Sequence, residues 1–399
     1  RIENPEPNLK VHQRKFMKIL GINTSHDSTV AWVEDNKLIH LYEEGRIRRE
    51  KWWSPLEEGG PQIDQCGFTA IPIKGLNNPD QVAFTSFDRR GVGVEFSNTV
   101  HNDRVLQKDI IDFISAKQMS WERYLEMEKE FGSTIVKRIE LGNGTDESIN
   151  EAVMNNSHFE GNPKVSFAPE HHYFHAVCAD HFSPYDESII ITWDGGGWRS
   201  QFDLYPGHQE IECIFHSKDG VIKPLYKRMC NTRELDQICQ QYFRGYSEDC
   251  LYCLEPDVQV IDDVEYEFVA LPSNGMNFSN MSVSLGCDDY GRSAGKVMGM
   301  ASYSSNPQIP NVFSRHTMAQ KLEIDALEHS KTVIQKAIDL VPDCKNIVLS
   351  GGYSLNCTNN YKYLQAFPDY QFFVDPVPHD GGTAVGAALD LWRKENVDD

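Results

Sequence analysis

The chain has 399 residues, of which 40% are hydrophobic, and a formal net charge of −21. This length is too great for one small core and predicts two or three packed lobes. The acidic charge argues against a general polyanion-binding surface, and no stretch approaches the roughly 18 apolar residues that span a bilayer. Ten scattered cysteines without an export signal indicate reduced thiols and a cytoplasmic protein.

The folded part is expected to begin at Met17, after a flexible polar leader over 1–16. Three strands are predicted between 17 and 44, and two short strands later, at DQVAFTSF and KVSFAP. The segment PEHHYFHAVCADHF follows them and is predicted to be a helix, because its apolar residues recur at helical spacing.

The opening order of elements recurs at 188, where SIIITWDGGGW precedes RSQFDLYPG and EIECIFHS. Strands at KNIVLSGG and YQFFVDPV then alternate with helices at LNCTNNYKYLQAF and GTAVGAALDLWRK. Two lobes, over 17–187 and 188–399, predict a duplicated α/β fold of the actin and sugar-kinase (ASKHA) type with a nucleotide cleft between them. The cysteine-containing range 206–277 departs from this order and is predicted to be an insertion in the second lobe.

Two histidines of the predicted helix, His171 and His175, are four residues apart. Residues at this spacing lie one above the other on a helix face, so both imidazoles could bind one metal ion. Asp380 precedes the final predicted helix and could complete a His/His/Asp site. The alternative for Asp380 is an N-cap, a position that aspartate fills well.

Turns rich in glycine and hydroxyl groups follow three of the predicted strands and are candidate phosphate loops. They lie at 21–28, at Asp194–Gly197 and at Gly351–Gly352. Lys296 stands in a predicted loop between two glycines and is suited to a phosphate oxygen. Each of these turns could also be purely structural.

A compact basic cluster, Arg46 to Lys51, is either a solvated helix face or a phosphate-facing group near the site. A CxxC pair at Cys250 and Cys253 raises a second question, since Cys230 and Cys239 could complete a zinc site with it. The separation of Cys230 and Cys239 differs from the usual pairing, so ordinary buried thiols are the favoured interpretation.

Seven motifs in order resemble the O-carbamoyltransferase family, which includes nodulation-factor and antibiotic carbamoyltransferases. They extend over most of 17–395 and are GINTSHDSTVAWVEDNKL, EEGRIRREK, EHHYFHA, DGGG, SAGKVMGMASY, NIVLSGGYSLNCTNN and DPVPHDGGTAVGAAL. The resemblance implies a Kae1-like domain of the ASKHA fold. It also implies a divalent metal, of the iron (Fe²⁺) type, bound by His171, His175 and Asp380.

The same resemblance implies the other site residues. His26 and Asp27 are the catalytic candidates, with His26 as the base that takes the acceptor proton. The candidates for contact with the carbamoyl donor or its phosphate are Arg46, Arg48, Arg49 and His172. The candidates for nucleotide contact are Ser28, Asp194, Gly195, Gly196, Gly197, Lys296, Gly351, Gly352 and Asn356.

The implied reaction transfers a carbamoyl group to an acceptor hydroxyl from carbamoyladenylate, which is made from carbamoyl phosphate and ATP. Family enzymes usually carry a second, YrdC-like domain that makes this adenylate, and 399 residues leave no room for it. Three sources of the adenylate are therefore open: a separate YrdC-like chain, a truncated second domain, or this lobe pair itself.

The expected acceptor is a small-molecule or sugar hydroxyl, or a hydroxymethylated pyrimidine such as 5-hydroxymethylcytosine. A homodimer is one option for the assembly. Two other functions compete with this interpretation. One is tRNA threonylcarbamoyl transfer, against which the acidic charge and the HHxxHA form argue. The other is a non-catalytic nucleotide-binding ASKHA module.

Overall fold

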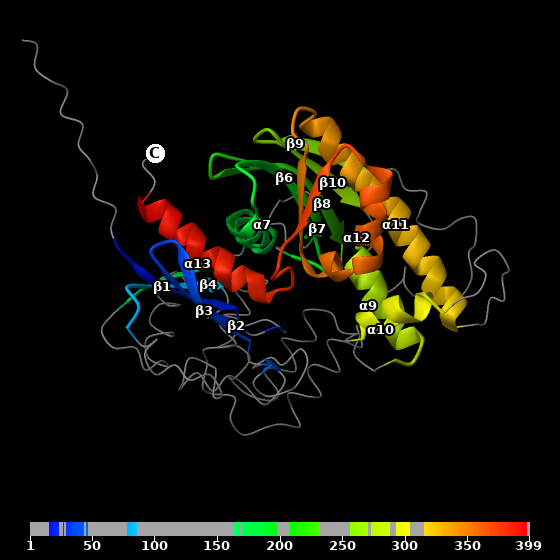
Figure 1. The fold of residues 1–399 in the computed structure, drawn as a ribbon, viewed down its shortest axis with the longest axis horizontal. Helices are drawn as coiled ribbons and strands as arrows, with labels where there is room; N and C mark the ends of the chain where they lie inside the picture. Colours follow the sequence, from blue (N-terminus) through cyan, green and yellow to red (C-terminus); the bar gives the residue numbers. More distant parts are fainter. Residues whose placement is uncertain are drawn as a thin grey trace, which may run out of the picture.

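The computed structural model describes residues 16–23, 27, 29–43, 45–46, 78–85, 163–167, 170–197, 208–231, 256–269, 273–287, 293–303 and 315–396. Within these ranges the chain forms two β-sheets, with helices between them and on the far side of the second (Figure 1). None of the described helices is both long and apolar enough to cross a membrane.

The first sheet has five strands in the order β3-β2-β1-β4-β5. The strands β1 (Lys18–Asn23), β2 (Thr29–Glu34) and β3 (Lys37–Glu43) form an antiparallel meander. The strands β4 (Gln81–Thr85) and β5 (Lys164–Phe167) continue the sheet parallel to β1. All five strands were predicted from the sequence.

The second sheet has seven strands in the order β12-β11-β6-β7-β8-β10-β9. Its meander consists of β6 (Glu187–Trp193), β7 (His208–Lys218) and β8 (Val221–Asn231). The strands β11 (Asn346–Ser350) and β12 (Gln371–Val374) run parallel to β6. The order β8-β7-β6-β11-β12 repeats that of the first sheet, which confirms the predicted duplication.

The predicted insertion at 206–277 is wrong in part, because β7 and β8 fall inside it and are the second and third strands of the repeat. The strands β9 (Asp257–Ile261) and β10 (Val264–Val269), also within this range, extend the same sheet beyond β8. The predicted strand RSQFDLYPG lies outside the described residues.

The predicted strand EIECIFHS is confirmed as β7, whereas β8 was not predicted, and charged residues that pair across the two strands account for this. Glu210 and Glu212 of β7 are buried and pair with Lys227 and Arg228 of β8 at 2.6 and 3.2 Å. Alternation of apolar and polar residues is the sequence signal of a half-buried strand, and carboxylates at buried positions interrupt it. These charges are compensated by residues on the neighbouring strand, and the sequence does not indicate which residues these are.

The helix α13 (Gly381–Asn396) packs on the first sheet against β1, β2 and β4, and on α7 (His171–Phe182). The predicted boundary, which assigned all of 188–399 to the second lobe, is therefore wrong for this last helix. Close backbone approach makes the packing possible. A Cβ atom at Gly386 would lie 2.0 Å from the carbonyl oxygen of Phe174 on α7.

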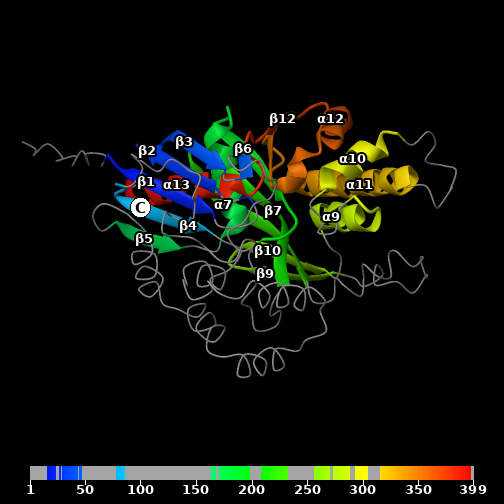
Figure 2. The same ribbon diagram turned by 90° about the horizontal axis from the view of Figure 1, so that it is seen from below.

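The second sheet is covered on both faces, because alternate side chains of β6 pack against different helices. Ile189 and Ile191 pack with the helices α9 (Asn274–Ser284) and α11 (Arg315–Leu340), whereas Ile190 packs with α7. Successive side chains of a strand point to opposite faces, so both faces of this strand are buried. Figure 2 shows α9, α10 (Ala294–Ala301) and α11 grouped on the side away from the first sheet.

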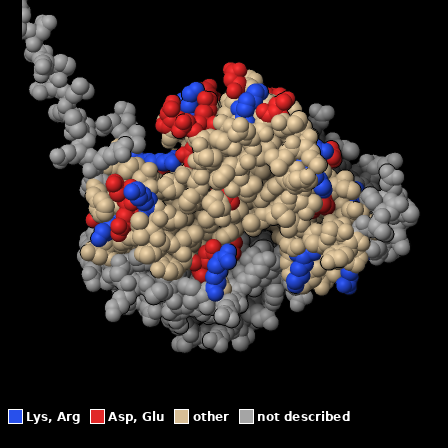
Figure 3. Space-filling model, viewed as in Figure 1, with Lys and Arg blue, Asp and Glu red and all other residues tan. Residues whose placement is uncertain are grey.

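The second half also contains three short helical elements. They are α10 (Ala294–Ala301), the 3₁₀ turn η4 (Gly352–Leu355) and α12 (Cys357–Ala366). On the face shown in Figure 3, the coloured Lys and Arg side chains are scattered among Asp and Glu rather than gathered in one basic area.

Candidate functional site

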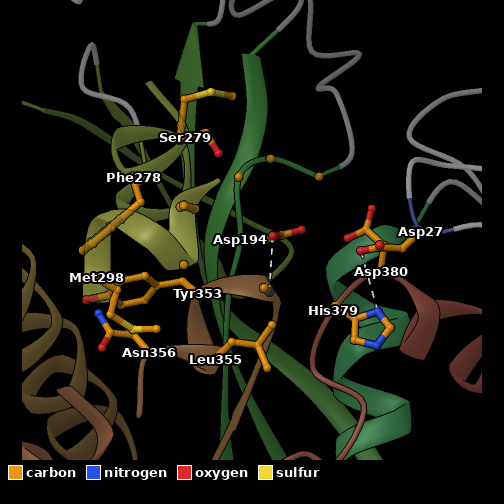
Figure 4. Close-up of a pocket in the computed structure, with 18 of the residues that line it drawn as sticks. Asp27, Asp194, Phe278, Ser279, Met298, Tyr353, Leu355, Asn356, His379 and Asp380 are labelled. Atoms are coloured by element: carbon orange, nitrogen blue, oxygen red, sulfur yellow. Dashed lines mark hydrogen bonds and ion pairs between the residues drawn. The ribbon is translucent and has the colours of Figure 1, made fainter. Parts of the chain in front are cut away.

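A cavity of about 550 Å³ lies where the two halves meet. Asp27, His379 and Asp380 lie on one side of it, and apolar side chains of the second half lie on the other (Figure 4). We call these sides the charged wall and the apolar wall. The apolar wall consists of Met276, Phe278, Met298, Tyr353 and Leu355.

The glycine turns predicted as phosphate loops meet at this cavity. Asp194–Gly197 follows β6, Gly351–Gly352 follows β11, and the Gly352 N–H donates to Asp194 Oδ1 at 3.2 Å. These two strands are parallel neighbours, and ligands of open α/β sheets bind at the carboxyl ends of such strands. The structure thus brings together two turns that are about 150 residues apart in sequence.

The predicted metal-binding histidines face one another inside the molecule. Both are buried on one face of α7, and the Nε2 atoms of His171 and His175 are 3.3 Å apart. Asp380 immediately precedes α13, and its Oδ1 lies 3.4 Å from His171 Nε2 and 3.7 Å from His175 Nε2. The three residues predicted as ligands are therefore together, and the Asp380 carboxylate faces the histidines.

Asp194 joins this cluster, which sequence reasoning did not anticipate. Its Oδ2 lies 3.1 Å from His171 Nε2 and 3.9 Å from His175 Nε2. Ligand atoms of His171, His175, Asp194 and Asp380 all lie within 4.8 Å of one another. The DGGG motif was interpreted as a phosphate turn, and only the fold shows that its aspartate lies beside the histidines.

The electrostatics of the cluster favour a cation. Burial alone would lower the pKa of His171, but Asp380 and Asp194 raise it to about 10. The pKa of Asp194 is lowered by His171, although burial and Asp380 oppose this. The two carboxylates therefore favour positive charge at His171.

The donor set also fits a transition metal ion. Two imidazoles with carboxylate oxygens are the ligands typical of non-haem iron and related divalent ions. The ring atom of His175 that faces the cluster is Nε2, which lies 3.3 Å from His171 Nε2. The other ring nitrogen, Nδ1, is buried and has no hydrogen-bond partner among the described residues. His171, His175, Asp194 and Asp380 are thus the residues that would hold the metal.

His379 is a site residue that sequence reasoning missed. Its Nδ1 lies 3.7 Å from Asp27 Oδ2, and its Nε2 lies 3.4 Å from Glu43 Oε1. Burial opposes protonation, but Glu43 and Asp27 raise the pKa of His379 above its ordinary value. The available signal was its place next to Asp380 in the motif DPVPHDGG.

Lys296 does not stand in a loop as predicted. It lies on α10, where Val297 and Ala301 are buried four residues apart and hold the segment as a helix. Its exposed amine donates to the Cys287 carbonyl at 3.2 Å, and the cavity is lined by Gly295 and Met298 from this helix.

Two other residues that were predicted to contact nucleotide or donor, Asn356 and His172, make hydrogen bonds within the protein. Asn356 lines the cavity, and its side chain accepts from the Asn359 N–H at the start of α12. His172 lies behind the Asp194–Gly197 turn, with Nδ1 3.1 Å from Cys213 Sγ. Burial and the neighbouring His171 lower the pKa of His172 well below its ordinary value.

The remaining predictions fall partly outside the described residues. Arg46 is exposed and pairs with Glu43, and Cys230 is buried. The predicted residues outside the description are His26, Ser28, Arg48, Arg49, Cys239, Cys250 and Cys253.

Comparison with known proteins assigns the chain to a family. Residues 18–389 match the family described as Carbamoyltransferase N-terminus. The chain belongs to this carbamoyltransferase family. The resemblance seen in the motifs is therefore confirmed.

Two relatives and one solved structure are similar to the chain. The protein sll1178 of Synechocystis is 23% identical over 94% of this chain and 57% of its own length. Nodulation protein NolNO of Sinorhizobium fredii is 27% identical over 57% of this chain and 31% of its own length. The chain thus spans little more than half of these relatives at most.

The solved structure is full-length HypF in its phosphate- and nucleotide-bound form. The TM-score is 0.50 at 10% identity, over 95% of this chain and 56% of HypF. This similarity supports the fold alone.

Proposed function

We propose that this chain carries the acceptor site of an O-carbamoyltransferase, where a carbamoyl group is transferred to a hydroxyl. One observation carries the proposal. The His171/His175/Asp194/Asp380 cluster adjoins the same cavity as the glycine turns, since Asp194 and Asp380 line both. A candidate metal site and a nucleotide-sized cavity are thus adjacent, which suits transfer from an adenylate.

The apolar wall suits the base of an adenylate. Phe278, Met298 and Tyr353 offer the flat and adaptable apolar surface that such a ring needs. The backbone amides of the Asp194–Gly197 and Gly351–Gly352 turns are suited to the phosphate. We assign the donor, carbamoyladenylate, to this side of the cavity, with its carbamoyl group toward the charged wall.

The charged wall suits the acceptor hydroxyl. Asp27 lies there with His379, which Glu43 holds from the other side. We propose that Asp27 orients the hydroxyl and that His26, its neighbour in sequence, accepts the proton. A divalent ion, Fe²⁺ in our proposal, would supply a Lewis acid that polarises a carbonyl or phosphate oxygen.

The acceptor we propose is a compact neutral hydroxyl compound or a hydroxymethylated pyrimidine. A net charge of −21 disfavours long duplex, and the described face carries scattered basic residues (Figure 3). If a pyrimidine in nucleic acid is the acceptor, it must leave the base stack to reach the cavity, which favours single strands.

The test supplies donors and acceptors separately. Full-length protein loaded with Fe²⁺ is incubated with a panel of sugars, antibiotic hydroxyl compounds and 5-hydroxymethylcytidine, and mass spectrometry follows the gain of a carbamoyl group. One arm receives carbamoyladenylate, one receives carbamoyl phosphate and ATP, and a third adds a YrdC-like protein. Product in the first arm supports the proposal. Nucleotide binding without product in any arm would favour a non-catalytic module.

A further inference from the structure

A second cluster of metal-binding side chains lies behind the Asp194–Gly197 turn. It consists of His172 on α7 with Glu210 and Cys213 on β7, all of them buried. One ligand atom from each lies within 4.8 Å of the other two. These three side chains are not among those that line the cavity, so the cluster is separate from the site described above.

Two polar atoms of this cluster are buried without a partner among the described residues. They are His172 Nε2 and Glu210 Oε2, on side chains with 0% and 1% exposure. The His172 atom that contacts Cys213 is Nδ1, at 3.1 Å from Sγ. A buried polar atom without a partner is unfavourable, so Glu210 Oε2 is the atom that indicates a ligand in this cluster. Lys227 donates to Glu210 Oε1 at 2.6 Å and holds the carboxylate while leaving Oε2 available.

We propose that His172, Glu210 and Cys213 bind a divalent ion of the zinc class. Nitrogen, sulfur and oxygen donors in one small set suit Zn²⁺, and a thiolate disfavours the hard ions Mg²⁺ and Ca²⁺. Binding forms a bond from the metal to the Cys213 sulfur, and the thiol proton passes to the solvent. Three protein ligands leave the fourth tetrahedral position to water.

The position of the site indicates a structural role. It joins α7 to β7, and the Glu210 carbonyl accepts from the Gly197 N–H at 2.7 Å. A Cβ atom at Gly197 would lie 2.8 Å from the His172 ring, so the turn and the ring are in direct contact. The ion would therefore hold the end of the Asp194–Gly197 turn in place from behind.

Cobalt offers a probe that distinguishes this site from the first, because Co²⁺ bound to a thiolate absorbs in the near ultraviolet by charge transfer. Full-length protein is stripped with a chelator and titrated with Co²⁺. The band should appear in the wild type and persist in Asp380→Asn, whose affected site has no sulfur ligand. It should vanish in Cys213→Ser, with bound cobalt falling by about one ion per chain.

Cys178→Ser is the matched control, because that thiol is also buried on α7 but points to Asp375. It should keep the band. Absence of the band in the wild type, or its persistence in Cys213→Ser, would overturn the proposal. If circular dichroism shows that Cys213→Ser does not fold, zinc-edge X-ray absorption of the zinc-loaded Asp380→Asn protein replaces it. A single sulfur neighbour supports the site, and nitrogen and oxygen neighbours alone refute it.

Discussion

The two walls of the cavity come from two halves that share one sheet topology, yet they differ in chemistry. The first half, with the start of α13, contributes Asp27, His379 and Asp380. The second half contributes glycine turns and an apolar surface that includes Phe278 and Tyr353. Because the five strands of the first sheet match five of the second in order, this difference arises in the segments attached to the strand ends.

The difference indicates that the two halves of the duplicated fold contribute different binding functions. Charged groups beside the metal-binding cluster can bind a cation and orient a hydroxyl, whereas apolar side chains can hold a flat ring without competing for the metal. Each of the five substitutions below alters one wall of the cavity or the protein structure that supports it. They run from the largest expected effect to the smallest.

Asp380→Asn should have the largest effect, on metal binding. The change removes a ligand charge 3.4 Å from His171 Nε2. Partners beyond the direct ligands typically contribute 10–100-fold in metal affinity, so a direct ligand should contribute at least about 100-fold. Iron content and Fe²⁺ titration measure this. The control is Asp390→Asn, which changes a buried carboxylate on α13 that accepts a hydrogen bond from Tyr173. Equal iron loss in both variants would refute the ligand assignment.

Glu212→Gln tests how a buried carboxylate in the second sheet makes stability depend on pH. Burial opposes ionisation, but His329 and Arg228 hold the pKa of Glu212 at about 2, below its ordinary 4.5. A lowered folded pKa adds stability above the unfolded pKa, and this stability is lost as the pH falls from about 5 to about 2. The shift corresponds to on the order of 3 kcal/mol.

The free energy of unfolding of Glu212→Gln should therefore be lower at neutral pH and change less between pH 5 and 2, measured with urea. Glu328→Gln is the control, since Glu328 precedes His329 on α11 but pairs with Lys331 at the surface. An unchanged acid slope in Glu212→Gln would show that this buried pair does not govern acid stability.

Gly351→Ala should destabilise the turn behind the apolar wall by about 2 kcal/mol or more. Gly351 has φ +84°, and an added Cβ would lie 2.2 Å from the Trp193 carbonyl oxygen. Gly295→Ala is the control: nothing lies within 4 Å of its added Cβ, and alanine favours the helix by about 0.5–1 kcal/mol. Chemical denaturation should thus give changes of opposite sign, and equal signs would contradict the geometry.

Leu355→Ala tests the apolar wall without disturbing the core. Leu355 lines the cavity and is 55% exposed, so a bound base would cover it. The variant should bind adenylate about 1 kcal/mol more weakly, roughly fivefold, with little change in stability. Leu364→Ala removes a similarly exposed leucine that does not line the cavity and should bind normally by calorimetry. If both bind normally, the base does not sit against this wall.

Lys296→Ala should have the smallest effect. The amine is exposed and bonded to the Cys287 carbonyl, so nucleotide affinity should change by less than about 0.5 kcal/mol. The sequence pattern alone predicts a loss of about 1–3 kcal/mol, the strength of a hydrogen bond to a charged group. A tenfold weaker affinity would show that Lys296 reaches the phosphates when the nucleotide binds.

The sequence by itself determined the local elements and the family. Apolar alternation located the strands, and the spacing of His171 and His175 predicted their shared helix face, because both periodicities are local properties. Ordered motifs were sufficient for the carbamoyltransferase resemblance, which the family match confirmed. The repeated order of elements predicted the duplication that the two sheets show.

Only the tertiary structure decided which distant residues meet. Asp194 joins the histidines because β6 ends beside α7, and α13 returns to the first sheet because its apolar face fits there. The charged residues of β8 concealed that strand, since Lys227 and Arg228 pair there with carboxylates of β7 that the sequence cannot locate. The same holds for His172, Glu210 and Cys213, which share no local motif and come together only when α7 packs on β7.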